Sequence, residues 1–236
     1  MSRFEDCLLG ASVPVIMEIK RRGGDGADLL RGRSVRDVVE RYEALGAPCL
    51  SVVTGSWFGG DEALLREVAS LTDLPILRKD MIRGENELGE AKAMGASAVL
   101  LIARVLSRSA LRRLTLAALE HDLTPVVEIA TPSDLQRVAE PTRCVISVNN
   151  KDVLARERGA GDLRRSLALL PALRCAQAHA TVSASAIERS ADARRLLKAG
   201  FDALLIGTGL LLADDLGQWL ADACALSGVG EDSTGI

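Results

Sequence analysis

The segment PVIMEIK at residues 14–20 decides the fold, because it joins a short apolar run to a charged end and the same pattern recurs along the chain. Runs rich in Val, Ile and Leu, separated by amphipathic stretches, are typical of parallel strands that are buried on both faces and covered by helices. There are eight such runs: PVIMEI from Pro14, CLSVV from Cys49, PILR from Pro75, AVLLI from Ala98, TPVVEI from Thr124, CVISVN from Cys144, ATVSA from Ala180 and ALLI from Ala203.

Eight strand–helix units fit a closed (β/α)8 TIM barrel, although a doubly wound open sheet alternates in the same way. Polar residues follow the carboxyl ends of most of the runs, as a barrel active site requires, whereas an open sheet gathers its functional groups at one crevice. The segment GGDGADLLRG at residues 23–32 does not match the nucleotide fingerprint G-x-G-x-x-G. We therefore predict one α/β barrel domain over residues 1–228, with a shortened N-terminal extension and a flexible polar tail at 229–236.

Helix boundaries are marked by capping residues. Ser34 and Asp37 form an acidic variant of the capping box, which predicts that a helix begins after Ser34. Gly46, Gly95 and Gly200 each stand between an amphipathic stretch and the next apolar run, where a left-handed residue ends a helix.

Composition excludes several classes of protein. The chain has 236 residues, 48% of them hydrophobic, and a net charge of −3 without a basic stripe, so nucleic acid and anionic membranes are not expected partners. Acidic residues near the N-terminus are unlike a secretory signal, and no run approaches a membrane span. Five scattered cysteines without a C-x-x-C pair predict reduced thiols, a cytoplasmic location and no metal site.

Charged residues at the ends of the apolar runs are the first candidates for chemistry. Glu18 and Lys20 are two positions apart and share one face of their strand, as a functional pair or as an ion pair that caps the core. Lys79 is the residue of Arg78-Lys79-Asp80 that we expect to enter the mouth, where desolvation beside other cations lowers a lysine pKa and suits a proton donor. The alternative for Lys79 is a solvated charge at a strand end.

Further candidates follow the later runs. Glu128, embedded in β-branched residues, is either paired with a lysine or available as a base. Asn149 and Lys151 follow the sixth run, where an amide can orient a hydroxyl and a lysine can meet an anion. Gly207 and Thr208, together with the segment around Ser185, offer backbone N–H groups where many barrels hold phosphate, although a tight turn also needs glycine. Trp57 and Phe58 either line an aromatic pocket or pack against each other.

The order of these motifs along the chain is similar to that of a known enzyme family. MEIK, SVVT followed by WFGG, LPILRKD, GASAVLLIA, PVVEIA, ISVNNKD and LLIGTGLL occur along almost the whole chain. In this order they resemble indole-3-glycerol phosphate synthase. The family converts 1-(2-carboxyphenylamino)-1-deoxyribulose 5-phosphate to indole-3-glycerol phosphate in tryptophan biosynthesis, with loss of carbon dioxide and water and without a cofactor.

The resemblance also implies roles for the candidate residues. Lys79 resembles the general acid that protonates the ribulose carbonyl, and Glu128 the group that assists dehydration. Glu18, Lys20 and Asn149 would orient the intermediate and balance its charge. The remaining positions would bind substrate: Phe58 and Met81 at the aromatic ring, and Ser185, Gly207, Thr208 and Lys151, where the family usually has arginine, at the phosphate.

The chain departs from the family pattern at the same mouth. Gly23-Gly24-Asp25 replaces serine-proline-serine and adds a negative charge that repels an anionic substrate unless the loop turns it away. Met81 replaces a phenylalanine, Ala184 replaces a glutamate, and the methyl of Ala186 replaces a glycine hydrogen. The short segment before the first strand predicts less cover over the site.

These departures leave alternative functions open. One is a diverged paralogue acting on a related arylamino sugar phosphate, and another is a non-catalytic barrel that binds a phosphorylated ligand or a partner protein. A phosphate-binding isomerase of histidine or tryptophan synthesis is disfavoured, because such enzymes place acid–base residues at other strand ends. The expected assembly is a monomer or a weak homo-oligomer, and the expected partner is a phosphorylated small molecule.

Overall fold

The computed structural model describes residues 2–154 and 159–225 and contains a closed barrel of eight parallel strands. Each strand pairs with the next along the chain, and β8 pairs with β1 through partners such as Ile16 and Leu205. The closed order excludes the open-sheet alternative, and all eight predicted runs form strands. The strands are β1 (Val15–Ile19), β2 (Leu50–Val53), β3 (Ile76–Lys79), β4 (Ala98–Ile102), β5 (Thr124–Ile129), β6 (Val145–Asn149), β7 (Ala180–Ala184) and β8 (Ala203–Ile206).

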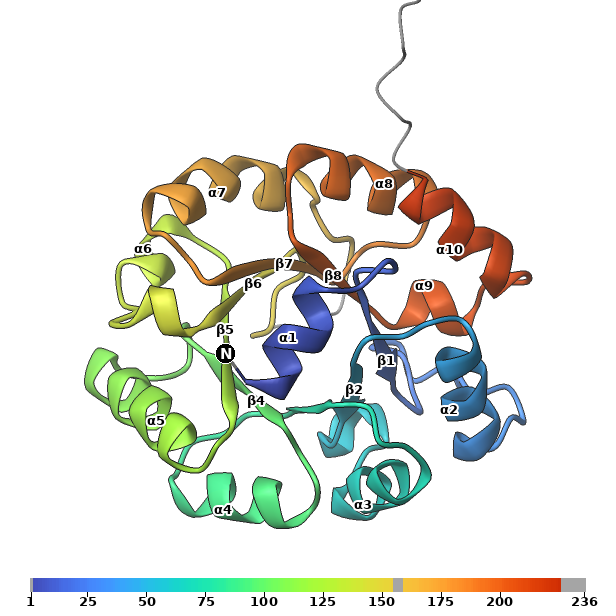
Figure 1. Ribbon diagram of the computed structural model, residues 1–236, viewed down its shortest axis with the longest axis horizontal. Coiled ribbons are helices and arrows are strands. Elements are labelled where there is room, and N and C mark those ends of the chain that lie inside the picture. The colour runs from blue at the N-terminus through green and yellow to red at the C-terminus, as the bar shows by residue number, and fades with distance from the viewer. Residues whose placement is uncertain (1, 155–158, 226–236) are drawn as a thin grey trace, which may run out of the picture.

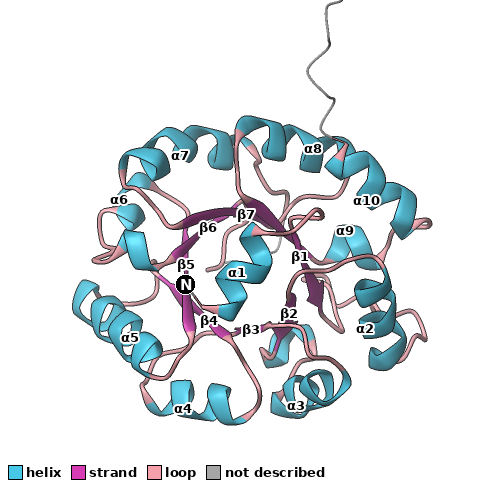
Figure 2. Ribbon diagram, viewed as in Figure 1, coloured by secondary structure: helices cyan, strands magenta, loops and turns pink. Residues whose placement is uncertain are grey.

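Helices other than α1 form an outer ring around the strands (Figure 2). The helices of the described residues are α1 (Arg3–Leu9), α2 (Val35–Ala44), α3 (Glu62–Leu71), α4 (Asn86–Ala93), α5 (Arg108–Glu120), α6 (Pro132–Leu135), α7 (Arg164–Cys175), α8 (Ser190–Ala199), α9 (Thr208–Leu211) and α10 (Leu216–Cys224), with short 3-10 turns η1 (Ser56–Phe58) and η2 (Pro141–Arg143). None of the helices in the described ranges is both long and apolar enough to cross a membrane.

The predicted helix boundaries are confirmed. The Ser34 side chain accepts a hydrogen bond from the backbone N–H of Asp37, and the Asp37 carboxylate accepts one from the N–H of Ser34. Gly46, Gly95 and Gly200 have φ angles of 79°, 96° and 104°, in the left-handed region that a residue with a side chain rarely adopts. These turns return the chain from the outer helices to the next strand.

Helix α1 closes the end of the barrel at which the strands begin, and Figure 1 shows it across the middle of the ring. Its Phe4 and Leu8 are fully buried and belong to the apolar cluster inside the barrel. Ser2 bonds to Thr124 at the start of β5, and Arg3 donates to the carbonyl of Asp73, just before β3. The N-terminal segment therefore covers the bottom of the barrel. The tail expected at 229–236 lies outside the described residues.

Candidate active site

Charged side chains at the carboxyl ends of β1, β3 and β5 point into the barrel. Side chains two positions apart share one face of a strand, and the residues two positions before these charges belong to the interior apolar cluster. Those residues are Ile16, Leu77 and Val126. Glu18, Lys79 and Glu128 are each less than a tenth exposed. The barrel therefore brings together three of the predicted catalytic residues from strands that are far apart in the sequence.

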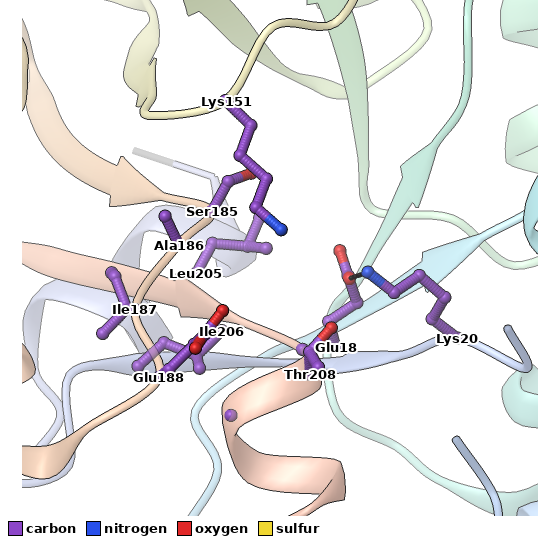
Figure 3. Close-up of a pocket in the computed structure, with 12 residues that line it drawn as sticks. Glu18, Lys20, Lys151, Ser185, Ala186, Ile187, Glu188, Leu205, Ile206 and Thr208 are labelled. Atoms are coloured by element: carbon purple, nitrogen blue, oxygen red, sulfur yellow. Dashed lines mark ion pairs between the residues drawn. The ribbon is translucent and has the colours of Figure 1, made fainter. Parts of the chain in front are cut away.

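Glu18 is shared between two lysines. Its Oε1 lies 3.2 Å from the Nζ of Lys20, and its Oε2 lies 3.3 Å from the Nζ of Lys79. Lys20 also lies over the Phe58 ring, 5.1 Å from its centroid. Figure 3 shows the Glu18–Lys20 pair at the edge of a pocket. The Glu18 carboxylate thus holds two buried ammonium groups at the mouth of the barrel, where they can meet an anionic ligand.

The position of Glu18 depends on its neighbours. A Cβ atom on Gly207 would lie 2.3 Å from Glu18 Oε1, so only glycine leaves room for the carboxylate. Behind the strand, the Tyr42 hydroxyl donates to the Glu18 backbone carbonyl at 3.2 Å. Burial raises the pKa of Tyr42 above its ordinary value, so this hydroxyl stays protonated as a donor.

An apolar pocket opens beside Lys79 and Glu128. Its walls include Met81 and the aromatic residues Trp57 and Phe58, whose ring centroids are 6.0 Å apart. Phe58 is buried, whereas Trp57 is 37% exposed. The two aromatic residues thus pack together and also line the pocket, so both sequence interpretations hold. A flat aromatic group in this pocket would lie next to a buried ammonium group and a buried carboxylate.

A second, polar pocket lies between the ends of β7 and β8 (Figure 3). It is lined by Glu18, Lys20, Lys151, Ser185, Ala186, Ile187, Glu188, Leu205, Ile206, Gly207, Thr208 and Gly209. The Lys151 side chain points into this pocket in Figure 3. All four residues predicted to bind phosphate therefore line one pocket, together with the Glu18–Lys20 pair.

Asn149 ends β6 and is buried inside the mouth. Its Oδ1 accepts the backbone N–H of Lys151 at 2.8 Å, which fixes the orientation of the amide. Its Nδ2 is buried and has no hydrogen-bond partner within residues 2–154 and 159–225. A buried donor without a partner is costly, so Nδ2 is a candidate for contact with a bound ligand.

The departures from the family pattern have distinct structural outcomes. The Asp25 carboxylate is exposed and accepts the N–H of Ala27 at 3.1 Å, and Asp25 lines a neighbouring cavity together with Lys151 and Thr208, so the added negative charge stays near the polar pocket. Ala184 is buried in the interior cluster at the end of β7. Ala186 has a φ of 61°, so its methyl group sits on a backbone that glycine adopts more easily.

The structure adds residues that sequence reasoning missed. Arg165 of α7 donates to the carbonyls of Asn149 and Lys151, at 2.6 and 2.9 Å, and so holds the end of β6. Glu188 adds a carboxylate to the lining of the polar pocket. Neither residue stands in an apolar run, so the pattern that exposed Glu18 and Glu128 gives no signal for them.

Comparison with known proteins agrees with this arrangement. A family model described as indole-3-glycerol phosphate synthase matches residues 2–222. The chain is 35% identical over 233 residues to a protein of Archaeoglobus fulgidus named tryptophan biosynthesis protein TrpCD, covering 97% of this chain and 41% of that protein.

Two further relatives are similar in length to the chain. The chain is 36% identical over 208 residues to the indole-3-glycerol phosphate synthase of Pyrococcus furiosus, covering 88% of this chain and 90% of the relative. It is 32% identical over 207 residues to that of Staphylococcus aureus, covering 87% and 77%. A family model that spans nearly the whole chain, and relatives above 30% identity, establish that the chain belongs to the indole-3-glycerol phosphate synthase family.

Proposed function

We propose that the protein is a carbon–carbon lyase that converts 1-(2-carboxyphenylamino)-1-deoxyribulose 5-phosphate to indole-3-glycerol phosphate in tryptophan biosynthesis. The observation that carries the proposal is the adjacency of two unlike pockets. One is apolar and aromatic and contains Lys79 and Glu128, and the other is polar and contains Lys20 and Lys151. This pair of pockets suits a substrate with an aryl ring at one end and a phosphate at the other.

The proposed reaction begins when the aryl ring lies against Phe58 and the phosphate lies on Lys151 and the Gly207–Thr208 turn. The ring carbon that bears the carboxylate attacks the ribulose carbonyl, and Lys79 donates a proton to the carbonyl oxygen. Loss of carbon dioxide restores the aromatic ring, so no outside oxidant or reductant is needed. Proton donation by a positioned side chain contributes roughly 10²–10⁴-fold to a rate.

Dehydration then forms the C2–C3 double bond of the indole, because the hydroxyl on the former carbonyl carbon leaves as water and the neighbouring carbon loses a proton. Glu128 is the proposed proton carrier for the departing water, and Asn149 Nδ2 is the proposed donor to a substrate oxygen. Glu18 holds Lys79 and Lys20 in place through its two oxygens, at 3.3 and 3.2 Å. In a buried site such fixed charges act on the transition state without reorganisation.

The cellular context belongs to the same proposal. We infer one barrel domain over residues 1–228 with a polar tail at 229–236, acting in the cytoplasm as a monomer or weak homo-oligomer. The five cysteines are free thiols, which agrees with a reducing compartment.

The test is turnover of the purified protein with this substrate, followed by indole fluorescence. Lys79→Ala is expected to lower kcat at least about 100-fold with little change in melting temperature. Lys92→Ala is the matched control, because its ammonium group lies on α4 and donates to the carbonyl of Asp122, away from the mouth. A folded protein without turnover, or a Lys79→Ala variant as active as the control, would contradict the proposal and favour a diverged substrate or a binding role.

A further inference from the structure

Asn150 connects three elements behind the polar pocket and takes no part in the proposed chemistry. Its Nδ2 lies 3.1 Å from Ser183 Oγ, 2.9 Å from the Ala184 carbonyl and 3.2 Å from the Ser185 carbonyl. Its Oδ1 accepts from Ser166 of α7, from the hydroxyl at 2.8 Å and from the N–H at 3.3 Å. The side chain is 1% exposed, and both ends of its amide are engaged by these hydrogen bonds rather than directed at the pocket.

The segment that Asn150 contacts has an unfavourable backbone. Ser185 and Ala186 have φ angles of 65° and 61°, and this left-handed conformation costs a residue with a side chain roughly 1–2 kcal/mol. The Ala186 methyl is accommodated by Gly161, where an added Cβ would lie only 2.2 Å from it. Two consecutive strained residues persist only where the surroundings hold them. The contacts from Asn150 to the Ala184 and Ser185 carbonyls provide this restraint.

The restrained turn is a wall of the polar pocket. Ser185, Ala186 and Ile187 line it opposite Gly207 and Thr208, where we place the substrate phosphate. Relaxation of the turn would move the backbone that faces the anion, while Lys79 and Glu128 lie at the other pocket.

We propose that Asn150 is a positioning residue for anion binding: it holds the Ser185–Ala186 turn in the conformation that receives the substrate phosphate. The assignment of that phosphate rests on the proposed function. The amide at this position both donates to the turn and accepts from Ser166, whereas a carboxylate would lack the donor and an apolar side chain would lack both. A residue that shapes ground-state binding of a remote group changes KM and leaves kcat nearly constant.

The test compares Asn150→Ala with Ser166→Ala. Both substitutions remove hydrogen bonds from the same buried network, but the second leaves the donation from Asn150 to the turn intact. For each variant, KM and kcat are measured with the substrate, the dissociation constant for inorganic phosphate by phosphorus NMR titration, and the melting temperature. Asn150→Ser replaces Asn150→Ala if the latter does not fold.

Asn150→Ala is expected to raise both KM and the phosphate dissociation constant roughly three- to tenfold, the loss of about one hydrogen bond, with kcat within about twofold. Ser166→Ala is expected to lower the melting temperature without changing either binding constant. Equal losses of stability with unchanged binding in both variants would overturn the proposal, as would a fall in kcat alone or the absence of phosphate binding by the unsubstituted protein. If that protein binds phosphate but does not turn over the substrate, the proposed function fails and the phosphate constants still decide the role of Asn150.

Discussion

Replacement of Gly207 by alanine tests whether the position of the Glu18 carboxylate controls the chemistry. The backbone at Gly207 has a φ of −111°, outside the left-handed region that favours glycine, so the main obstacle to a side chain is contact with Glu18. The added methyl would lie 2.3 Å from Glu18 Oε1 and 3.0 Å from Glu18 Cδ. The substitution thus disturbs the charged site without removing a charge.

The expected size of the effect follows from these distances. An ordinary van der Waals contact requires the carboxylate to move by roughly 1 Å. That movement disturbs the pairs with Lys20 and Lys79, which now lie 3.2 and 3.3 Å from Glu18. A displacement of about 1 Å at a catalytic group can lower a rate roughly 100-fold, and overpacking costs about 1–3 kcal/mol of stability.

The assay is kcat and KM for the proposed substrate, with a chemical denaturation curve for each variant. Gly89→Ala in α4 is the matched control, because the nearest atom to its added methyl is His121 Cε1 at 3.8 Å. Alanine in a helix interior is expected to stabilise the protein by about 0.5–1 kcal/mol relative to glycine without affecting turnover. A Gly207→Ala variant with kcat within about threefold of the parent protein would refute the reasoning.

Three other predictions concern stability and reactivity. Ala186→Gly is expected to raise the free energy of unfolding by about 0.5–1 kcal/mol, because glycine relieves the φ of 61°, and a lower value in urea denaturation would contradict the strain argument. Burial raises the pKa of Cys144 from 9.0 to about 12, so this thiol stays protonated at pH 8 whereas Cys175 is exposed. Iodoacetamide should therefore label Cys175 at least about tenfold faster than Cys144 in the native protein, as measured by peptide mass spectrometry. Because the unfolded thiol ionises first, the contribution of Cys144 to stability should be lost as pH rises from 9 to 12, and denaturation curves that do not change over this range would count against it.

The barrel could be predicted from sequence because its strands repeat a simple pattern of apolar runs. The charged residues could be predicted because they interrupt those runs. Strands buried on both faces give apolar runs, and the glycines at 46, 95 and 200 mark where helices end. Glu18, Lys79 and Glu128 are conspicuous because a charge inside or at the end of such a run is costly without a purpose. Their shared direction into the barrel follows from strand alternation.

The supporting contacts could not be predicted because they join residues that only the closed barrel brings together. Asn150 reaches Ser183 across 33 positions, and Arg165 reaches Asn149 across 16. Asn150 stands in an ordinary polar cluster after a strand, and nothing in that cluster distinguishes the amide that faces the pocket from the one behind it. The second pairing of the Glu18 carboxylate, with Lys79, also depends on closure of the barrel.

The loss of a carboxylate at Ala184 changes how the remaining charges must act. Odd-numbered strands contribute one layer of a barrel interior, and here that layer contains Glu18, Lys79, Glu128 and the apolar Ala184. Glu18 pairs with Lys20 and Lys79, and in the proposed reaction Glu128 is the carboxylate of this layer that carries the proton. The same loss removes a negative charge near a substrate that carries both phosphate and carboxylate. The layer should therefore bind the anionic substrate well and depend strongly on Glu128 for the dehydration step.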